Sequence, residues 1–132
     1  MSAKYAFDKE LELRDLADGA ESSSADEAGV AFDVLSAGDF KVVFEVTALD
    51  TADADETYSL VVDTDSLAAF TDSPVEVADI TVTATGTFEI PLSGDYIASL
   101  DADAAAIRVG AVLGGTTPSI TYGAFLAPSE KV

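Results

Sequence analysis

Apolar and polar side chains alternate along several short segments of the chain, which is the pattern of β-strands with one buried face. The clearest alternation runs through residues 40–49, in which Lys41 and Glu45 stand between apolar neighbours. The apolar members of this strand, which we expect in the core, are Phe40, Val42, Phe44 and Val46.

Similar patterns predict further strands at residues 5–13, 30–35, 58–62, 75–83, 86–92, 96–100, 106–113 and 120–126. The apolar register changes between Val77 and Ile80, which indicates a β-bulge near Asp79. Pro91 cannot donate a ladder hydrogen bond, so its strand is expected at a sheet edge or to end there. Residues 15–29 lack periodicity and are rich in acidic and small side chains, which predicts an exposed loop. At residues 101–106 a helical turn competes with irregular structure.

About eight short strands at roughly 8–15-residue spacing, with turn residues between them, predict an all-β fold rather than alternating strands and helices. We expect an antiparallel β-sandwich, closed as a jelly roll or in an immunoglobulin-like manner. The length of 132 residues fits one domain spanning residues 1–132.

The charge balance restricts the partners of such a domain. The chain has six basic and 25 acidic residues, which gives a net charge of −19. This field repels phosphate backbones and anionic lipid, so we expect neither nucleic acid nor a membrane as partner. No Lys or Arg lies between Lys41 and Arg108. A partner of that stretch is therefore neutral, basic or bridged by cations.

Histidine and cysteine are absent, which excludes Ser-His-Asp and Cys-His mechanisms and the commonest neutral metal ligand. No glycine-rich phosphate loop is present. A carboxylate pair for glycoside hydrolysis stays open, but tryptophan is absent. The tyrosines lie within apparent strands, which favours structural roles for Tyr5, Tyr58, Tyr96 and Tyr122. We therefore expect no enzyme, no catalytic residues and no cofactor.

The densest acidic turn contains Asp50, Asp53, Asp55 and Glu56. Calcium takes clustered carboxylate oxygens of this kind, but the central glycine of the usual 12-residue calcium loop is missing. We expect a solvated turn without a metal, with calcium binding as the alternative.

The segments FKVVFEVTALD, DETYSLVVDTDSLAAFTD and VEVADI, followed by PLSGDYIASLDADAAAIRVGAVLGGTTPSITYGAFL, add more than periodicity. Over residues 1–126 the chain resembles the capsid cement or decoration proteins of tailed phages. This resemblance implies a jelly-roll-like sandwich, made in the host cytoplasm, that forms a homodimer or homotrimer on the outer capsid surface. There it would bind the major capsid protein and hold neighbouring subunits together.

Near the two chain ends, Tyr5, Phe7, Phe125 and Leu126 are candidates for subunit or capsid contacts, with core packing as the alternative for each. Two other functions stay open. One is a different virion β-module, from a tail or fibre. The other is a carbohydrate-binding sandwich, which would need either a cation site at one loop end or an exposed aromatic platform, for instance at Tyr96 or Tyr122.

Overall fold

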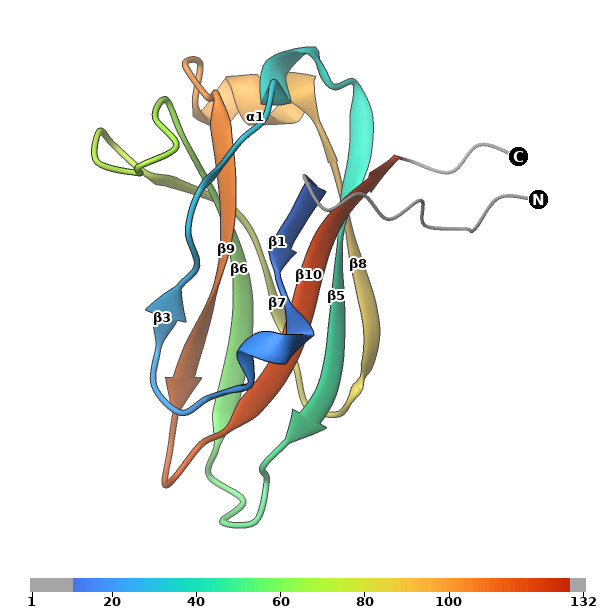
Figure 1. Cartoon of the computed structure of the whole chain (residues 1–132), viewed down its shortest axis with the longest axis vertical. Coiled ribbons are helices and arrows are strands. Elements are labelled where there is room, and N and C mark those ends of the chain that lie inside the picture. Colours follow the sequence, from blue (N-terminus) through green and yellow to red (C-terminus); the bar gives the residue numbers. More distant parts are fainter. Residues whose placement is uncertain (1–10, 129–132) are drawn as a thin grey trace, which may run out of the picture.

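The chain forms two antiparallel sheets that pack face to face, in a computed structural model that describes residues 11–128 (Figure 1). The first sheet has the order β1-β10-β5-β8, with β2 also pairing with β10. Its strands are β1 (Glu12–Arg14), β2 (Ala20–Glu21), β5 (Asp39–Leu49), β8 (Gly86–Ser93) and β10 (Ile120–Pro128). The second sheet has the order β3-β9-β6-β7, with β4 also pairing with β9. Its strands are β3 (Ala25–Asp26), β4 (Val30–Ala31), β6 (Thr57–Asp65), β7 (Val75–Thr81) and β9 (Ala106–Gly114).

The pairing is nested along the chain. Strands β1 and β2 pair with the last described strand, β10, and β3 and β4 pair with the one before it, β9. Inside these pairs, β5 pairs with β8 and β6 with β7. Counting β1 with β2 and β3 with β4 as single broken strands gives eight, wound as a long hairpin rolled into two sheets, which is a jelly roll. The predicted all-β sandwich is confirmed.

The core lies between the two sheets and follows the predicted alternation. The four apolar residues expected inside, Phe40, Val42, Phe44 and Val46, are all at most 4% exposed. Phe44 meets Tyr122 of β10 with ring centroids 6.2 Å apart. Burial raises the pKa of Tyr122, and its hydroxyl has no hydrogen-bond partner within the described structure. The Tyr58 hydroxyl, also in the described core, differs in that it donates to the Asp50 carbonyl and accepts from the Ser119 N–H.

One predicted strand is wrong. Residues 96–100 belong to helix α1 (Gly94–Leu100) and not to a strand. The Ser93 side chain accepts a hydrogen bond from the Tyr96 N–H at 3.1 Å, and Asp95 lies in the first turn, which together favour a helix start. Ile97 is the fully buried apolar side chain of this helix. The N-terminal cap therefore outweighs the short strand-like alternation of residues 96–100. At residues 101–106 no further helix forms: α1 ends at Leu100 with Asp101 as its C-cap, and a single turn follows in which the Ala104 N–H donates to the Asp101 carbonyl at 3.3 Å.

Other boundaries shift by a few residues. The segment 30–35 is a strand only at β4, and the short 3₁₀-helix η3 (Val34–Ser36) follows. The predicted bulge is present in β7, but at Val77, because Ala78 and Glu76 pair with consecutive residues of β6. Pro91 lies in β8, an outer strand of the first sheet, as predicted. Residues 5–10 of the first predicted strand lie outside the described residues.

The segment expected as an exposed loop at residues 15–29 has more structure than predicted. It contains a second 3₁₀-helix, η2 (Leu16–Asp18), and the strands β2 and β3. Because β2 edges the first sheet and β3 the second, the segment crosses one open side of the sandwich. We call residues 15–31 the strap.

Arg14 fastens the strap to the sandwich. Its side chain is 1% exposed. It donates to the Tyr122 carbonyl at 2.6 Å, to Glu27 Oε2 at 3.1 Å, and to the Gly19 carbonyl and Glu21 Oε1 at 3.0 Å each. Its guanidinium carbon lies 4.5 Å from the centre of the Tyr122 ring. Burial alone would lower the pKa of Arg14, but the hydrogen bonds that it donates to the carboxylates of Glu21 and Glu27 raise it above its ordinary value.

Candidate interaction surface

One end of the sandwich carries α1, η3 and the loop of residues 66–74, which we call the α1 end (Figure 1). Helix α1 rests directly on η3. The Gly94 N–H donates to the Gly38 carbonyl at 3.0 Å. A Cβ at Gly94 would stand 2.9 and 2.6 Å from the carbonyl oxygens of Val34 and Leu35, so this close approach requires glycine. The helix is therefore fixed rather than loosely attached.

A buried carboxylate, that of Asp65, binds both ends of the 66–74 loop. Asp65, 1% exposed, accepts hydrogen bonds from the N–H groups of Ser66, Asp72 and Ser73 at 2.8 to 3.1 Å. Burial alone would raise the pKa of Asp65, but these three donors bring it below its ordinary range. The neighbouring Thr64 hydroxyl donates to Asp101 Oδ2 at 2.9 Å, which joins the end of β6 to the end of α1.

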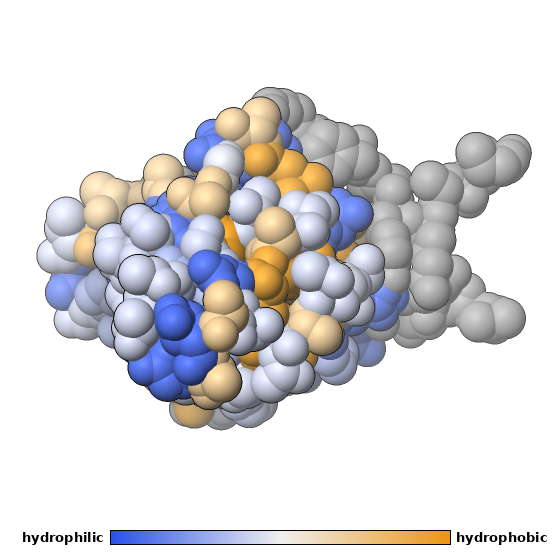
Figure 2. Space-filling view, turned by 90° about the horizontal axis from the view of Figure 1, so that it is seen from below, coloured by the Kyte–Doolittle hydropathy of each residue, from blue (hydrophilic) through white to orange (hydrophobic). Residues whose placement is uncertain are grey.

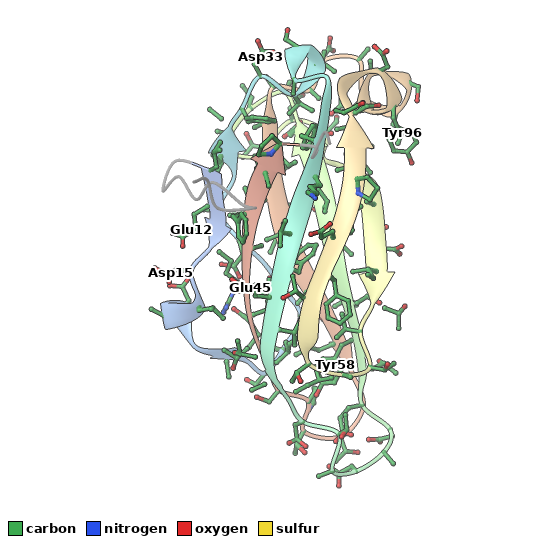
Figure 3. All side chains as sticks on the ribbon, turned by 90° about the vertical axis from the view of Figure 1, so that its right-hand side faces the viewer. Glu12, Asp15, Asp33, Glu45, Tyr58 and Tyr96 are labelled. Atoms are coloured by element: carbon green, nitrogen blue, oxygen red, sulfur yellow. The ribbon has the colours of Figure 1, made fainter. Side chains whose placement is uncertain are left out.

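Large apolar side chains are exposed at this end. Leu67 is 51% exposed, Tyr96 49% and Leu100 46%. Tyr96 projects from α1 at the top of the face shown in Figure 3. Elsewhere in the described chain the exposed large apolar side chains are those of Val112, 53% exposed, and Leu16, 36% exposed. Exposed apolar groups that gather at one end of a folded domain are typical of contact surfaces.

A groove of about 410 Å³, the chain-end groove, opens at the same end. Both ends of the described chain reach it, since Leu11 and Pro128 line it. Its other lining residues are Phe32, Asp33, Ser36, Ala37, Asp39, Phe40, Leu126 and Ala127. Asp33 marks its position at the top of Figure 3. The lining is mainly apolar, with acidic groups at its margin.

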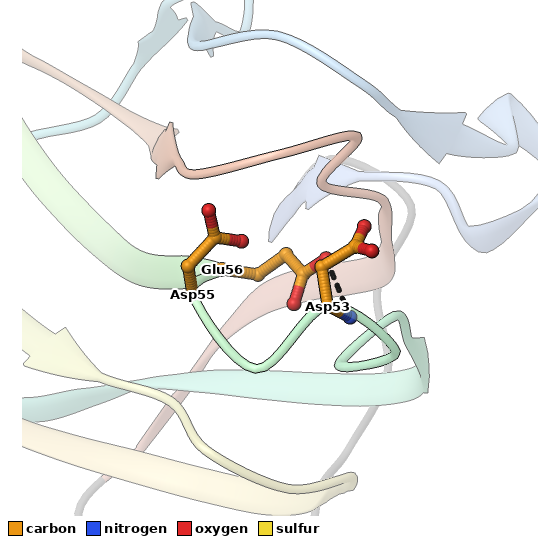
Figure 4. A group of neighbouring side chains, drawn as sticks. All are labelled: Asp53, Asp55 and Glu56. Carbon is orange, nitrogen blue, oxygen red and sulfur yellow. Dashed lines mark hydrogen bonds between the residues drawn. The ribbon is translucent and has the colours of Figure 1, made fainter.

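The opposite end contains the acidic turn (Figures 1 and 2). Ligand oxygens of Asp53, Asp55 and Glu56 lie within 4.8 Å of one another, a spacing that could hold a cation (Figure 4). Asp55 accepts from the N–H and hydroxyl of Thr116 at 3.0 and 2.8 Å, and Asp53 accepts from the Thr117 hydroxyl at 3.0 Å. The Thr116 bonds lower the pKa of Asp55. Asp53 and Asp55 thus join two loops, whereas Glu56 accepts from the Asp53 N–H at 3.2 Å within the turn.

The sequence candidates fall into three groups. Tyr5 and Phe7 lie outside the described residues. Leu126, 2% exposed, belongs to the main core. Phe125, 8% exposed, lies with Val43 and Ala127 in a separate apolar cluster, because alternation along β10 turns it away from that core. Of these residues, Leu126 also lines the chain-end groove.

No family model, no curated protein and no solved structure matches the chain. No helix among residues 11–128 is long and apolar enough to cross a membrane.

Sequence reasoning did not single out Leu67 or Leu100. Leu67 stands alone among acidic and small residues, in DTDSLAAFTD, where it has no periodic partner to suggest burial. An isolated leucine in an acidic loop is the signal that could have found it. Leu100 was assigned to the strand at residues 96–100, which concealed its position at the end of an exposed helix.

Proposed function

We propose that the chain is a non-enzymatic structural protein of a virion, which binds the outside of the capsid and cements neighbouring major capsid subunits. The observation that carries this proposal is the exposure of Leu67, Tyr96 and Leu100 at the α1 end of a rigid sandwich. The sequence resemblance to cement proteins names the partner, and the jelly roll fits that resemblance.

Apolar contact suits a protein with this charge. A net charge of −19 works against docking onto acidic surfaces and against close approach of its own copies. Burial of apolar side chains is insensitive to the sign of the partner's charge. A half-exposed leucine that becomes buried contributes about 1 kcal/mol, or about fivefold in affinity. Several such contacts, repeated in an oligomer, would give stable attachment through avidity.

Co-sedimentation with empty shells of the proposed partner, a major capsid protein, tests the proposal. We expect the chain to bind assembled shells and not unassembled coat protein, because a cementing site is shared between subunits. Leu67→Ser and Leu100→Ser should each weaken binding about fivefold. Val112→Ser is the matched control, because Val112 is equally exposed but lies on β9, outside the α1 end. No binding to shells, or equal losses in all three variants, would contradict the proposal.

A salt series separates apolar from electrostatic attachment. Raising sodium chloride from about 0.1 to 1 M shortens the Debye length from about 10 to 3 Å. Occupancy on shells should hold or increase if apolar burial carries the attachment, because salt does not weaken it. Release of the protein from intact shells at high salt would show instead that a basic capsid patch holds it.

A further inference from the structure

The side of the sandwich opposite the strap is open, and it carries a second groove, the edge groove. Here β7 ends the second sheet and β8 ends the first, and neither has another strand beside it in the described chain. The edge groove between them measures about 660 Å³. Its lining consists of Asp39, Phe40, Val77, Ala78, Asp79, Ile90, Pro91, Leu92, Ser93 and Tyr96.

The floor of the edge groove is apolar and one end is closed by an aromatic ring. Phe40, Val77 and Leu92 are at most 7% exposed and belong to the core beneath it. Tyr96, half-exposed on α1, lies at the upper end of this edge (Figure 3). An extended segment lying here would therefore cover apolar surface along its inner side.

The backbone of β7 is turned toward the edge groove at its bulge. Val77 has no direct partner on β6, whereas its neighbours Glu76 and Ala78 do. The Val77 carbonyl instead accepts a long hydrogen bond, 3.4 Å, from the Tyr96 hydroxyl across the groove. Since backbone groups alternate in direction along a strand, the Asp79 N–H is expected on the same side as this carbonyl. Strand β7 thus offers the Asp79 N–H as a donor, and the Val77 carbonyl, which already accepts from Tyr96, keeps its second lone pair as an acceptor.

The two edges differ in what they can accept. On β8, Pro91 has no N–H, which blocks continuous pairing on that strand. On β7, acidic side chains restrict which strand can pair with the free edge, because Glu76 and Asp79 are exposed along it. Burial, together with the nearby Asp79 and Asp63, raises the pKa of Glu76, which indicates a negative potential over this strand. No basic side chain of the described chain lines the edge groove.

An acidic edge repels strands of this same acidic protein but attracts a cationic strand. Charged edge residues are a common device against edge-to-edge pairing between copies. Strand addition to a free edge obtains affinity from main-chain hydrogen bonds and specificity from alternate side chains. On β7 the outward side chains are acidic and the inward surface is apolar, so the two faces of an added strand would meet different surroundings.

We propose that β7 binds an extended segment of a partner protein in which Lys or Arg alternates with apolar residues. The basic side chains face Glu76 and Asp79, and the apolar ones lie in the edge groove against Ile90 and Tyr96. This proposal does not rest on the capsid function, since it concerns the isolated chain and a peptide.

The test uses the full-length chain and two synthetic peptides of identical composition, one with the alternating order Lys-Val-Lys-Val-Lys-Val-Lys and one with the block order Lys-Lys-Val-Val-Val-Lys-Lys. Calorimetric titration should show one alternating peptide per chain, bound at least about tenfold more tightly than the block peptide, because only alternation separates the two faces. Equal affinity of the two peptides would show simple charge attraction and overturn the proposal.

Variants locate the site. Asp79→Asn should weaken the alternating peptide about two- to fivefold, the range for a surface ion pair. Asp18→Asn removes the same charge from η2 on the strap side and should leave affinity within about twofold. Asp79→Pro also removes the edge N–H and should weaken binding more than Asp79→Asn, with folding verified by circular dichroism. Equal effects of Asp79→Asn and Asp18→Asn would refute binding at β7, whether or not the proline variant folds.

Discussion

Replacing Arg14 by methionine should open the strap side of the sandwich and cost a large share of the stability. Methionine keeps an apolar stem against Tyr122 but removes the charge and all four hydrogen bonds that Arg14 donates. Two of those bonds reach the carboxylates Glu21 and Glu27, whose side chains are 21% and 18% exposed. A third satisfies the buried Tyr122 carbonyl.

The size of the stability loss follows from the carboxylates of Glu21 and Glu27, which Arg14→Met leaves without their partner. Breaking a buried ion pair by removing one member costs about 3–5 kcal/mol, and the partial exposure of both carboxylates places this case at the lower end. We therefore expect a loss of about 3 kcal/mol from a domain whose total is about 5–15 kcal/mol. For a chain of this length the melting temperature should fall by roughly 10 °C. Arg14→Lys keeps the charge but loses the planar fork, so its loss should be intermediate.

The assay is urea unfolding at pH 7, followed by far-ultraviolet circular dichroism. A double-mutant cycle with Glu27→Gln separates the network from simple packing. In the natural background Glu27→Gln should destabilise by about 1 kcal/mol, because Arg14 loses a charged partner. In the Arg14→Met background it should be neutral or stabilising, because it removes an unpaired carboxylate. A loss below about 1 kcal/mol for Arg14→Met, or an equal effect of Glu27→Gln in both backgrounds, would refute this account of the strap.

Four further predictions concern pH, salt, metal and the core. The raised pKa of Glu76 means that the folded state prefers its protonated form, so the melting temperature should rise as pH falls from 7 toward the ordinary value of 4.5. Below about pH 3.8 the melting temperature should fall again, because Asp65, whose pKa is lowered, loses its charge. A melting temperature that falls steadily from pH 7 to pH 5 would contradict the prediction for Glu76. Sodium chloride should raise both the melting temperature and self-association, measured by calorimetry and analytical ultracentrifugation, since it screens the net charge of −19. Chelation of calcium should leave the melting temperature unchanged because Asp55 already binds Thr116, and a drop of more than about 10 °C would show a bound ion. Tyr122→Phe should leave the free energy of unfolding in urea unchanged or raise it by about 1 kcal/mol, because it removes a buried hydroxyl that has no hydrogen-bond partner. A clear loss of stability would show that this hydroxyl has a partner.

The sequence predicted the sandwich because long alternating segments determine which face is buried. Residues 40–49 illustrate this, since every second side chain is apolar and the observed β5 spans Asp39–Leu49. Short segments were less informative. At residues 96–100 the alternation was weak, and capping by Ser93, a local hydrogen bond outside the window, decided for a helix.

The candidate site was less predictable than the fold. Arg14 follows an alternating segment and resembles any exposed charge, because its partners Glu27 and Tyr122 are distant in sequence. The edge groove depends on which strands become outer strands, and that is a property of sheet order rather than of any one segment. Leu126 shows the same limit, since its position near the chain end did not reveal that its side chain faces the core.

The nested pairing has a consequence for biosynthesis. Glu12 pairs with Phe125, and Val30 with Ile107, so the outer strands wait for partners that are synthesised far later. The β6–β7 hairpin and then the β5–β8 pair can form first, and both leave apolar side chains exposed until β9 and β10 are synthesised. Closure therefore has to follow emergence of β10 from the ribosome, and it should be slow because distant segments must meet. During that interval, the net charge of −19 makes partly folded copies repel one another, which opposes their aggregation.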